Sequence, residues 1–513
     1  MGKHKIGKAM NTHAYIKYAI GLLMEEHGLQ DEQSITFVEI KKELVRGLNA
    51  FCVRPIEDYV GKTEVKFEFT SDKNNAKSYV YLSPNCITSE VKAGNLYKVV
   101  KDICQKTEMD LSKPYKILQS EVPTAGEFNV FSDKGNISRG KPSATVLSQC
   151  LALITSTTPL KPCLQYRSGA GKVTTDNVCL IPDIELSELV DFIKLFKRIR
   201  IQQLDSSLMV GKVKQVNGKV LRYEPKRPKI FNGNFPDAPR SSALGAIALL
   251  GAIGEMTKEE DTSQLAHRVL ESLKDANFYL FKYGDAQVFS FNNYVIDIAS
   301  KGQLRQIVDI MYRITLYNQG KRTTSNSFEY QKFDLFASRF LQMFSCAAFK
   351  DFLSFRAEYP SEITLLLNVY FNSMEKIGED IVKSARELGM WLNKVAYLSA
   401  KGTADSNSKD DIRKAKAKVL VELESSVFAA KSGDALIAHT IARAGRLSGL
   451  DVPEMASLFM ENTVSGLLPL EQAKNLLIAF SRLQFNKRNE NNMVDEWSQT
   501  EEYFENKEDL SDI

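Results

Sequence analysis

A chain of 513 residues is longer than one hydrophobic core usually serves, so roughly two to four domains are expected. Hydrophobic residues at 43% and charged residues at 25% match ordinary globular usage, which excludes a fibrous protein and a chain that is disordered throughout. The net charge is only +4, but residues 486–513 hold three basic and nine acidic residues, so residues 1–485 carry +10. This excess favours a polyanionic partner such as DNA or RNA.

The cysteines are seven in number, far apart and never spaced as CxxC: Cys52, Cys86, Cys104, Cys150, Cys163, Cys179 and Cys346. This pattern indicates reduced thiols in a reducing cytoplasm, and it argues against a disulfide framework and a cysteine-based zinc site. The apolar stretch near the start of the sequence is interrupted by lysine and is too short to cross a bilayer. We therefore expect a cytoplasmic protein with no secretory signal and no membrane partner.

The first elements predicted along the chain are a helix and a hairpin. Apolar residues at helical spacing predict a helix through residues 13–28 that ends at Gly28. Apolar and charged residues alternate in 63–70, and a polar turn then leads into the aromatic run at 78–82. Such alternation is typical of a β-hairpin with one buried face.

The middle of the sequence mixes both periodicities. We expect a helix at 89–109, loops between short strands at 115–180, and an amphipathic helix at 185–204. Asn217-Gly218 separates two β-rich runs within 211–224 and supplies the positive φ angles that a tight hairpin turn requires. A β-hairpin is therefore predicted there.

A linker-like segment rich in proline and glycine follows at 225–240. The small-residue apolar run at 241–256 then predicts a buried helix packed closely through its glycines. Two strands are expected around 277–284 and 287–299, and they complete the mixed region.

Beyond Gln303 the strand-like alternation disappears and helical periodicity prevails. Helices are predicted near 303–318, 328–357, 361–400, 409–431, 434–448, 453–465 and 469–485. The fold class expected is α+β, with a mixed α/β body and β-hairpins at 1–300, a connecting helical region at 301–372, an all-α bundle at 373–485 and a disordered acidic tail at 486–513.

No motif for a cofactor, a metal or catalysis stands out. The Gly-rich turn at 167–173 lacks the first glycine of a phosphate loop, and Val173 replaces the magnesium-binding Ser or Thr. His267 and His439 are most simply helix residues, since no histidine has a partner at metal-ligand spacing. We therefore predict a protein that is not an enzyme, has no cofactor and no metal site, and binds nucleic acid and partner proteins.

The densest positive charge lies between Lys194 and Lys229, a stretch that contains eleven basic residues and only two acidic ones. Counting back from the Asn-Gly turn pairs Val216 with Lys219, Lys214 with Leu221 and Lys212 with Tyr223, which would place three lysines and a tyrosine on one face. Such a face would follow phosphates, although a solvated charge run is the simpler alternative. The candidate nucleic-acid-binding residues here are Lys194, Lys197, Arg198, Lys212, Lys214, Lys219, Arg222, Lys226, Arg227 and Lys229.

Two further groups of residues are weaker candidates. Asn232 and Asn234 carry amides able to read base edges, as any polar loop does. In the predicted bundle, Arg413, Lys416, Arg443 and Arg446 are candidates, but lysines there also have acidic neighbours four residues away on the helix. Local ion pairing is the alternative for this second group.

The order of a mixed body without catalytic motifs and a C-terminal bundle resembles the large subunit of type I CRISPR effector complexes, called Cascade. The bundle sequences at 390–402 and 427–459 look most like type I-B members, including those of transposon-associated systems. Some of those relatives carry a CxxC zinc pair that this chain lacks.

The resemblance implies a subunit that binds guide RNA and target DNA, reads the protospacer-adjacent motif, helps to unwind the duplex and stabilises the R-loop. Its implied partners are the backbone subunit, the subunit at the guide 5′ end, and a nuclease-helicase or transposition adaptor. The resemblance also implies small subunits made from an internal start, for which Met374 and Met390 are candidates.

Two other classes of function remain open. One is a metal-dependent nucleic-acid enzyme of a mobile element, with Asp176, Asp183 and Glu185 as the first candidates for metal ligands. The other is a helical protein-interaction adaptor that does not bind nucleic acid.

Overall fold

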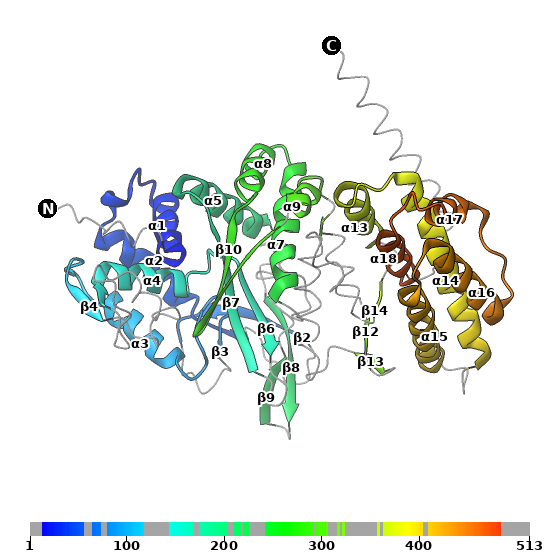
Figure 1. The fold of residues 1–513 in the computed structure, drawn as a ribbon. Coiled ribbons are helices and arrows are strands. Elements are labelled where there is room, and N and C mark those ends of the chain that lie inside the picture. Colours follow the sequence, from blue (N-terminus) through cyan, green and yellow to red (C-terminus); the bar gives the residue numbers. More distant parts are fainter. Residues whose placement is uncertain are drawn as a thin grey trace, which may run out of the picture. The chain divides into compact units, whose positions relative to one another are not determined.

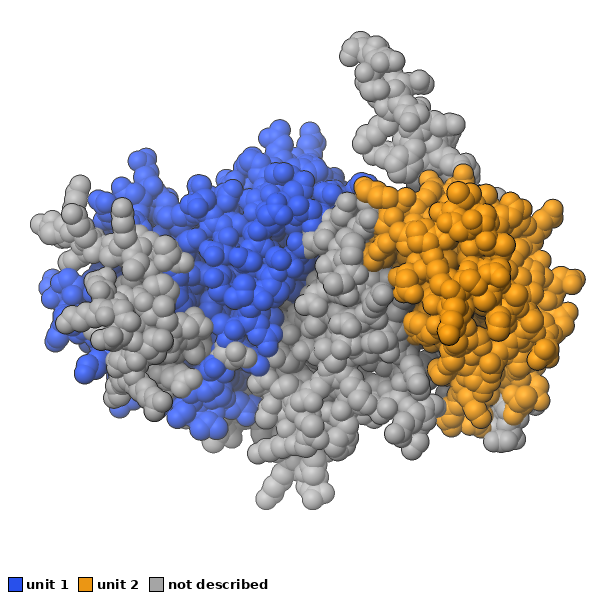
Figure 2. Space-filling model, in the orientation of Figure 1, with its two compact units in different colours: residues 1–312, 325–345 blue, residues 313–324, 346–513 orange. Residues whose placement is uncertain are grey.

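The computed structural model describes residues 13–55, 64–72, 80–116, 143–168, 174–202, 209–216, 219–224, 242–291, 293–302, 304–305, 315–318, 321–323, 357–359, 363–403 and 409–483. The chain divides into two compact units (Figure 2). Unit 1 comprises residues 1–312 and 325–345, and unit 2 comprises residues 313–324 and 346–513. The finer four-part division stays a prediction.

Unit 1 begins with two helices whose ends are set by their own residues. Helix α1 (Ala14–His27) ends at Gly28, which adopts the left-handed φ of 63° that glycine tolerates best. Helix α2 (Phe37–Asn49) starts at Thr36, and a capping box joins Thr36 and Glu39. The helix at 13–28 was predicted, whereas α2 was not.

A five-stranded antiparallel sheet has the strand order β3-β1-β2-β8-β9. Figure 1 labels four of its strands, β2, β3, β8 and β9. Its strands are β1 (Cys52–Pro55), β2 (Glu64–Thr70), β3 (Tyr81–Leu82), β8 (Met209–Val216) and β9 (Lys219–Glu224). The predicted hairpin of 63–70 with 78–82 is wrong, because β1 lies between β2 and β3 and pairs with both. The hairpin around Asn217-Gly218 is confirmed.

A second, four-stranded sheet has the order β11-β10-β7-β6. It comprises β6 (Cys163–Ser168), β7 (Thr174–Asp183), β10 (Asn277–Lys282) and β11 (Asp285–Ser290). Phe281 on β10 makes an edge contact with Tyr15, with ring centroids 4.9 Å apart, and so joins this sheet to α1. The second predicted strand runs too far, since the chain turns at Phe291 into helix α9 (Asn293–Ser300).

The described part of unit 1 also contains the helices α3 (Ala93–Cys104), α4 (Val146–Thr157), α5 (Leu186–Gln202), α7 (Ser242–Glu255) and α8 (Ser263–Ser272). Helix α4 corrects the expectation of loops throughout 115–180. Its twelve residues are all buried, so it has no polar face that a sequence pattern would reveal. Two short strands precede it, β4 (Pro114–Lys116) and β5 (Ser143–Thr145).

The glycine-rich helix α7 packs as predicted. A side chain at Gly254 would collide with the carbonyl oxygen of Ala299 on α9, and one at Gly251 would crowd the backbone of Arg305. These glycines therefore set the close approach of α7 to its neighbours.

Unit 2 is mainly helical: α13 (Thr364–Val369), a π-helical turn at Tyr370–Met374, α14 (Glu379–Thr403), α15 (Lys409–Ala429), α16 (Gly433–Ser448), α17 (Ser457–Val464) and α18 (Leu470–Ser481). Helix α14 packs against each of α15 to α18. The predicted helix at 361–400 is instead broken at residues 375–378. The prediction at 328–356 lies outside the described residues.

A small sheet of β12 (Thr315–Asn318), β13 (Lys321–Thr323) and β14 (Ala357–Glu358) also belongs to unit 2. It corrects the helix expected at 303–318, of which only residues 304–305 are helical among those described. The α+β fold class is nevertheless confirmed, with antiparallel sheets in unit 1 and a helical bundle in unit 2. No helix in the described part of the chain is long and apolar enough to span a membrane.

Candidate nucleic-acid interface

The predicted basic residues of helix α5 divide between its surface and its interior. The helix buries Leu189, Phe192, Ile193, Leu195, Phe196 and Ile199. Lys194 and Arg198 lie four residues apart and are exposed. They therefore share the outer face of α5 and are available to a phosphate.

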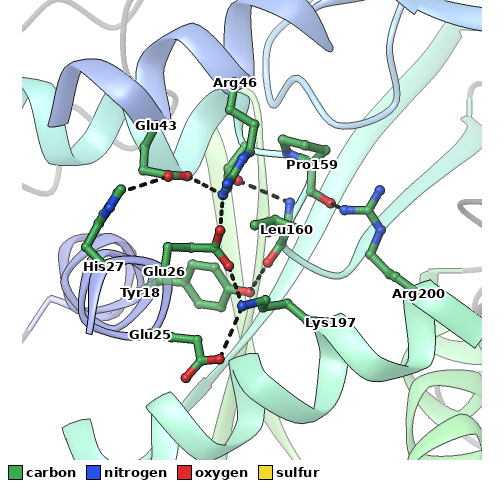
Figure 3. A network of polar contacts seen from close by, with 11 residues as sticks. Tyr18, Glu25, Glu26, His27, Glu43, Arg46, Pro159, Leu160, Lys197 and Arg200 are labelled. Atoms are coloured by element: carbon green, nitrogen blue, oxygen red, sulfur yellow. Dashed lines mark hydrogen bonds and ion pairs between the residues drawn. The ribbon is translucent and has the colours of Figure 1, made fainter. Parts of the chain in front are cut away.

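Lys197, on the same helix, is half-buried and pairs with acidic side chains of α1 (Figure 3). Its Nζ lies 3.2 Å from Glu25 Oε1 and 2.5 Å from Glu26 Oε1. Burial lowers the pKa of Lys197, but the hydrogen bonds and charges of the two glutamates outweigh it and raise the pKa above its ordinary value. We therefore leave Lys197 out of the interface.

The same network joins α1 to α2 through further charged side chains. Glu43 is buried, and its carboxylate bonds His27 Nε2 at 3.2 Å and Arg46 Nη1 at 2.8 Å. Arg46 also pairs with Glu26. These ions pair with one another and link three helices of unit 1 (Figure 3).

Arg200, the next cation along α5, is also internal. It donates a hydrogen bond to the carbonyl oxygen of Pro159, and burial lowers its pKa to about 10. Tyr18 donates to the neighbouring Leu160 carbonyl at 2.7 Å. The peptide at 159–160 is thus fixed by polar groups of α1 and α5.

The hairpin of β8 and β9 brings together four of the predicted lysines and arginines, but in a shifted register. Val216 pairs with Lys219 as predicted. A β-bulge between Lys214 and Gln215 then places Lys214 opposite Arg222 and Lys212 opposite Glu224, instead of Leu221 and Tyr223. The predicted grouping of Tyr223 with the three lysines is therefore wrong.

The bulge changes the electrostatics of the hairpin. On its other side β8 pairs with β2, which places Glu64 beside Lys212. Lys212 thus occupies a register position between two glutamates, whereas Lys214 is paired with another cation. Like charges directly opposite each other repel, so an anion is the favourable neighbour for the Lys214 and Arg222 pair.

The end of the predicted basic run, Lys226, Arg227 and Lys229, and the predicted base-reading residues Asn232 and Asn234 lie outside the described residues.

Unit 2 has a surface of exposed cations at one end of its bundle. Helix α14 ends at Thr403 and α15 begins at Lys409, so the last turns of α14 and the first turns of α15 lie at the same end. Helix α16 returns along α15, with Arg443 Nη2 3.3 Å from Glu422 Oε2 and Nη1 3.0 Å from Ser426 Oγ. Its last turns therefore run toward the start of α15.

We call this surface the basic end of the bundle. Its exposed cationic side chains are Lys394, Lys401, Arg413, Lys414, Lys418, Arg443 and Arg446. Within 394–403, 411–422 and 443–448 the only carboxylates are Asp411 and Glu422, which bond Lys414 at 3.0 Å and Arg443 at 3.3 Å. Among the described residues, Lys401, Lys418 and Arg446 form no ion pair. The alternative, that every cation of the bundle is paired with a nearby carboxylate, therefore does not explain the basic end.

Lys394, Tyr397, Leu398 and Lys401 are contributed by α14 and were not predicted. They follow one another at three- and four-residue spacing on one face, and the side chains of Tyr397 and Leu398 are 44% and 39% exposed. An exposed aromatic ring beside lysines is a surface on which a base can stack. The sequence pattern that could have predicted this face is the three- and four-residue spacing of lysines and a tyrosine on the side of α14 opposite its apolar stripe.

Lys416, in contrast, is buried on α15 with 8% of its surface exposed. We therefore leave it out of the interface, although Arg413, Arg443 and Arg446 remain in it.

The residues proposed for a metal-dependent enzyme do not form a site among the described residues. No group of three His, Cys, Asp or Glu side chains suited to a metal ion occurs in the described ranges. Asp183 bonds Lys17 Nζ at 3.1 Å, and Glu185 is exposed. Asp176 pairs through its backbone with Tyr166, and nothing is described of its side chain.

The Gly-rich sequence at 169–172 lies between β6 and β7, which pair antiparallel from Ser168 and Thr174 onward. A phosphate loop joins a strand to a helix, so the context differs from that motif.

The cysteines are not poised as nucleophiles. The six described cysteines are free thiols. Burial raises the pKa of Cys104 to about 11 and that of Cys150 to about 12, so both stay protonated at neutral pH.

Comparison with known proteins gives one family. The model of the family described as CRISPR-associated protein Csp2 matches residues 13–484, which extend over most of both units. No curated protein matches the chain. The matched range contains every candidate interface residue named above.

Proposed function

Because the chain belongs to the CRISPR-associated protein Csp2 family and is thus a subunit of a CRISPR effector complex, we propose that it is the non-catalytic large subunit and contacts nucleic acid through two surfaces. One is the basic end of the bundle, and the other comprises Lys194, Arg198 and the β8–β9 hairpin. The observation that carries the proposal is the basic end, where, among the side chains that the structure describes, seven exposed cations accompany two carboxylates. Polyanion binding is the simplest use of such a surface.

The proposed role in the complex depends on which contacts the guide RNA makes and which the protein makes. Guide pairing supplies sequence specificity, so the protein needs phosphate contacts and a few base-edge contacts. We assign the mixed body to recognition of the protospacer-adjacent motif and to duplex unwinding, with Lys214, Lys219 and Arg222 on the hairpin as phosphate contacts. We assign the basic end of the bundle to the displaced strand of the R-loop.

The proposed partners are guide RNA, target DNA, the backbone subunit and the subunit at the guide 5′ end. A nuclease-helicase or a transposition adaptor is the proposed downstream effector.

Small subunits made from an internal start are part of the proposal, and the geometry of unit 2 favours Met374 over Met390. A product from Met374 would contain α14 to α18 complete. A product from Met390 would lose residues 379–389 of α14. Among them, Ser384 Oγ donates to the Met455 carbonyl at 2.7 Å and accepts from the Phe459 amide at 2.9 Å. We therefore propose Met374 as the start.

The experiment is a binding measurement on the purified complex with a guide of known sequence. Target duplexes with randomised flanks are incubated with the complex, and bound molecules are sequenced. The proposal expects enrichment of a short motif next to the guide-matched sequence, and loss of that enrichment when the large subunit is omitted. Enrichment that is unchanged without this subunit would contradict motif recognition by it.

Incubation of bound duplex with Mg²⁺ or Mn²⁺ tests the enzyme alternative in the same sample. The proposal expects intact DNA while no separate nuclease is present.

A further inference from the structure

The basic end of the bundle lies within reach of an acidic segment of the same chain. Residues 489–513 hold nine carboxylates and one lysine, so the segment carries −8. Trp497, Tyr503 and Phe504 are interleaved with these acids. A chain of negative charges interrupted by aromatic rings presents the same two chemical features as a single nucleic-acid strand, phosphate charge and stacking surface.

The described end of unit 2 fixes where this segment starts. Arg482 Nε bonds Glu424 Oε1 at 2.7 Å, and Leu483 pairs with Tyr359 in an isolated bridge. The chain therefore leaves the described structure beside the second half of α15. Eleven residues of helix separate Glu424 from Arg413, which is about 17 Å at 1.5 Å per residue.

The length of the segment exceeds this distance. Residues 484–513 number thirty, and an extended chain spans about 3.3 Å per residue. Attachment to the same bundle also raises the effective concentration of the segment near the basic end to about the millimolar range. Weak contacts therefore suffice to keep the segment bound at the basic end.

We propose that residues 489–513 bind the basic end of the bundle and compete there with single-stranded nucleic acid. The carboxylates pair with Lys401, Lys418 and Arg446, and the aromatic rings lie against Tyr397 and Leu398. This inference rests on the proposed nucleic-acid contact for its competitive part, but binding of the segment itself does not depend on it. In a complete complex, a nucleic-acid strand displaces the segment, which keeps the surface from binding unrelated polyanions.

The test uses the full-length chain and a full-length variant in which Glu501→Gln, Glu502→Gln and Glu505→Gln remove three charges. A matched control removes three exposed charges in unit 1 through Glu108→Gln, Glu260→Gln and Asp261→Asn. Binding of a fluorescein-labelled 20-nucleotide oligodeoxythymidylate is measured by anisotropy at 50 mM and 200 mM salt. The segment variant should bind about tenfold more tightly than the natural chain at 50 mM salt, with a smaller gain at 200 mM.

The control should bind less than about threefold more tightly, because its charges are not tethered at the surface. Equal affinities of the segment variant and the control would overturn the proposal.

A second measurement separates failure of this inference from failure of the proposed function. A labelled peptide of residues 489–513 is titrated into the segment variant without nucleic acid. The proposal expects saturable binding that weakens with salt and is lost when Lys401, Lys418 and Arg446 are changed to Gln. No peptide binding, with the oligonucleotide still bound, would overturn the inference alone. Peptide binding without oligonucleotide binding would support docking of the segment and overturn the competition and the proposed function of this surface.

Discussion

Arg482 and Glu424 form a two-point ion pair inside unit 2, with Nε 2.7 Å from Oε1 and Nη2 3.0 Å from Oε2. Their side chains are only 4% and 11% exposed. Arg482 also donates to the Tyr359 hydroxyl at 3.3 Å, and the Tyr359 amide donates to the Arg482 carbonyl at 2.8 Å. This pair therefore connects α15, the end of α18 and Tyr359, which follows β14.

Loss of one partner should destabilise unit 2, because the other charge is left buried. We expect Glu424→Ala to lower the free energy of unfolding by about 3–5 kcal/mol. Urea unfolding followed by the fluorescence of Trp391, which is buried on α14, measures this change. Glu422→Ala on the same helix is the control, since its pair with Arg443 is exposed and should cost at most about 1 kcal/mol. Similar losses for both variants would contradict the assignment.

Acid should weaken unit 1 through Glu26. Burial raises the pKa of Glu26, but hydrogen bonds from Lys197 and Arg46 and their charges outweigh it and lower the pKa below its ordinary value of 4.5. A lowered pKa contributes stability above the unfolded value, and this stability is lost as the pH falls from about 5 through the folded pKa. We expect Glu26→Gln to reduce the pH dependence of the urea midpoint between about pH 5 and 3. Glu260→Gln, at an exposed site, should leave the pH dependence unchanged.

The elements that local residues determine were predictable from the sequence. Gly28 ends α1, and β8 and β9 pair antiparallel on either side of Asn217-Gly218. The bulge at Lys214 and Gln215 was not predictable, because the backbone register across a bulge depends on how β8 also pairs with β2. Insertion of β1 between β2 and β3 is likewise a pairing of distant segments, which local alternation does not encode.

The candidate site was predictable in composition but not in geometry. Lys194 and Lys197 look alike in the sequence, yet one is exposed and the other pairs with Glu25 and Glu26 on α1. Lys416 sits among exposed cations of α15 but is itself buried. Tertiary packing decides both cases, and the α14 residues Lys394 and Tyr397 emerge only once exposure is known.

Neutralising the basic end should weaken nucleic-acid binding with a recognisable salt signature. We expect the triple variant Lys401→Gln, Lys418→Gln and Arg446→Gln to bind a single-stranded oligonucleotide more weakly. The slope of log K against log salt should become shallower by about 2, because each lost phosphate contact releases about 0.7 fewer counterions from a single strand. Titrations at several salt concentrations measure the slope.

The control for this prediction is the triple variant Lys98→Gln, Lys106→Gln and Lys113→Gln, which removes three exposed cations from unit 1. It should leave the slope for the single strand within about 0.5 of the natural chain. An equal fall in slope for both triple variants would indicate a general charge effect and contradict a site at the basic end.

An internal start at Met374 should give a bundle that folds by itself. A fragment from Met374 retains α14 complete, including Gly389, where a side chain would collide with the backbone of Phe480. We expect cooperative unfolding of that fragment and none from a fragment that begins at Met390. Intact-mass analysis of the expressed gene should show a second species with the mass of residues 374–513. A full-length species alone would contradict the internal start.

The most direct test of the central claim is purification of this chain with the products of its neighbouring genes, followed by sequencing of the RNA that copurifies. A large subunit of a CRISPR effector complex should bring down guide RNAs with repeat-derived ends, in a fixed ratio to the other subunits. Recovery of the partner proteins without any RNA would contradict the account and favour a protein-interaction adaptor.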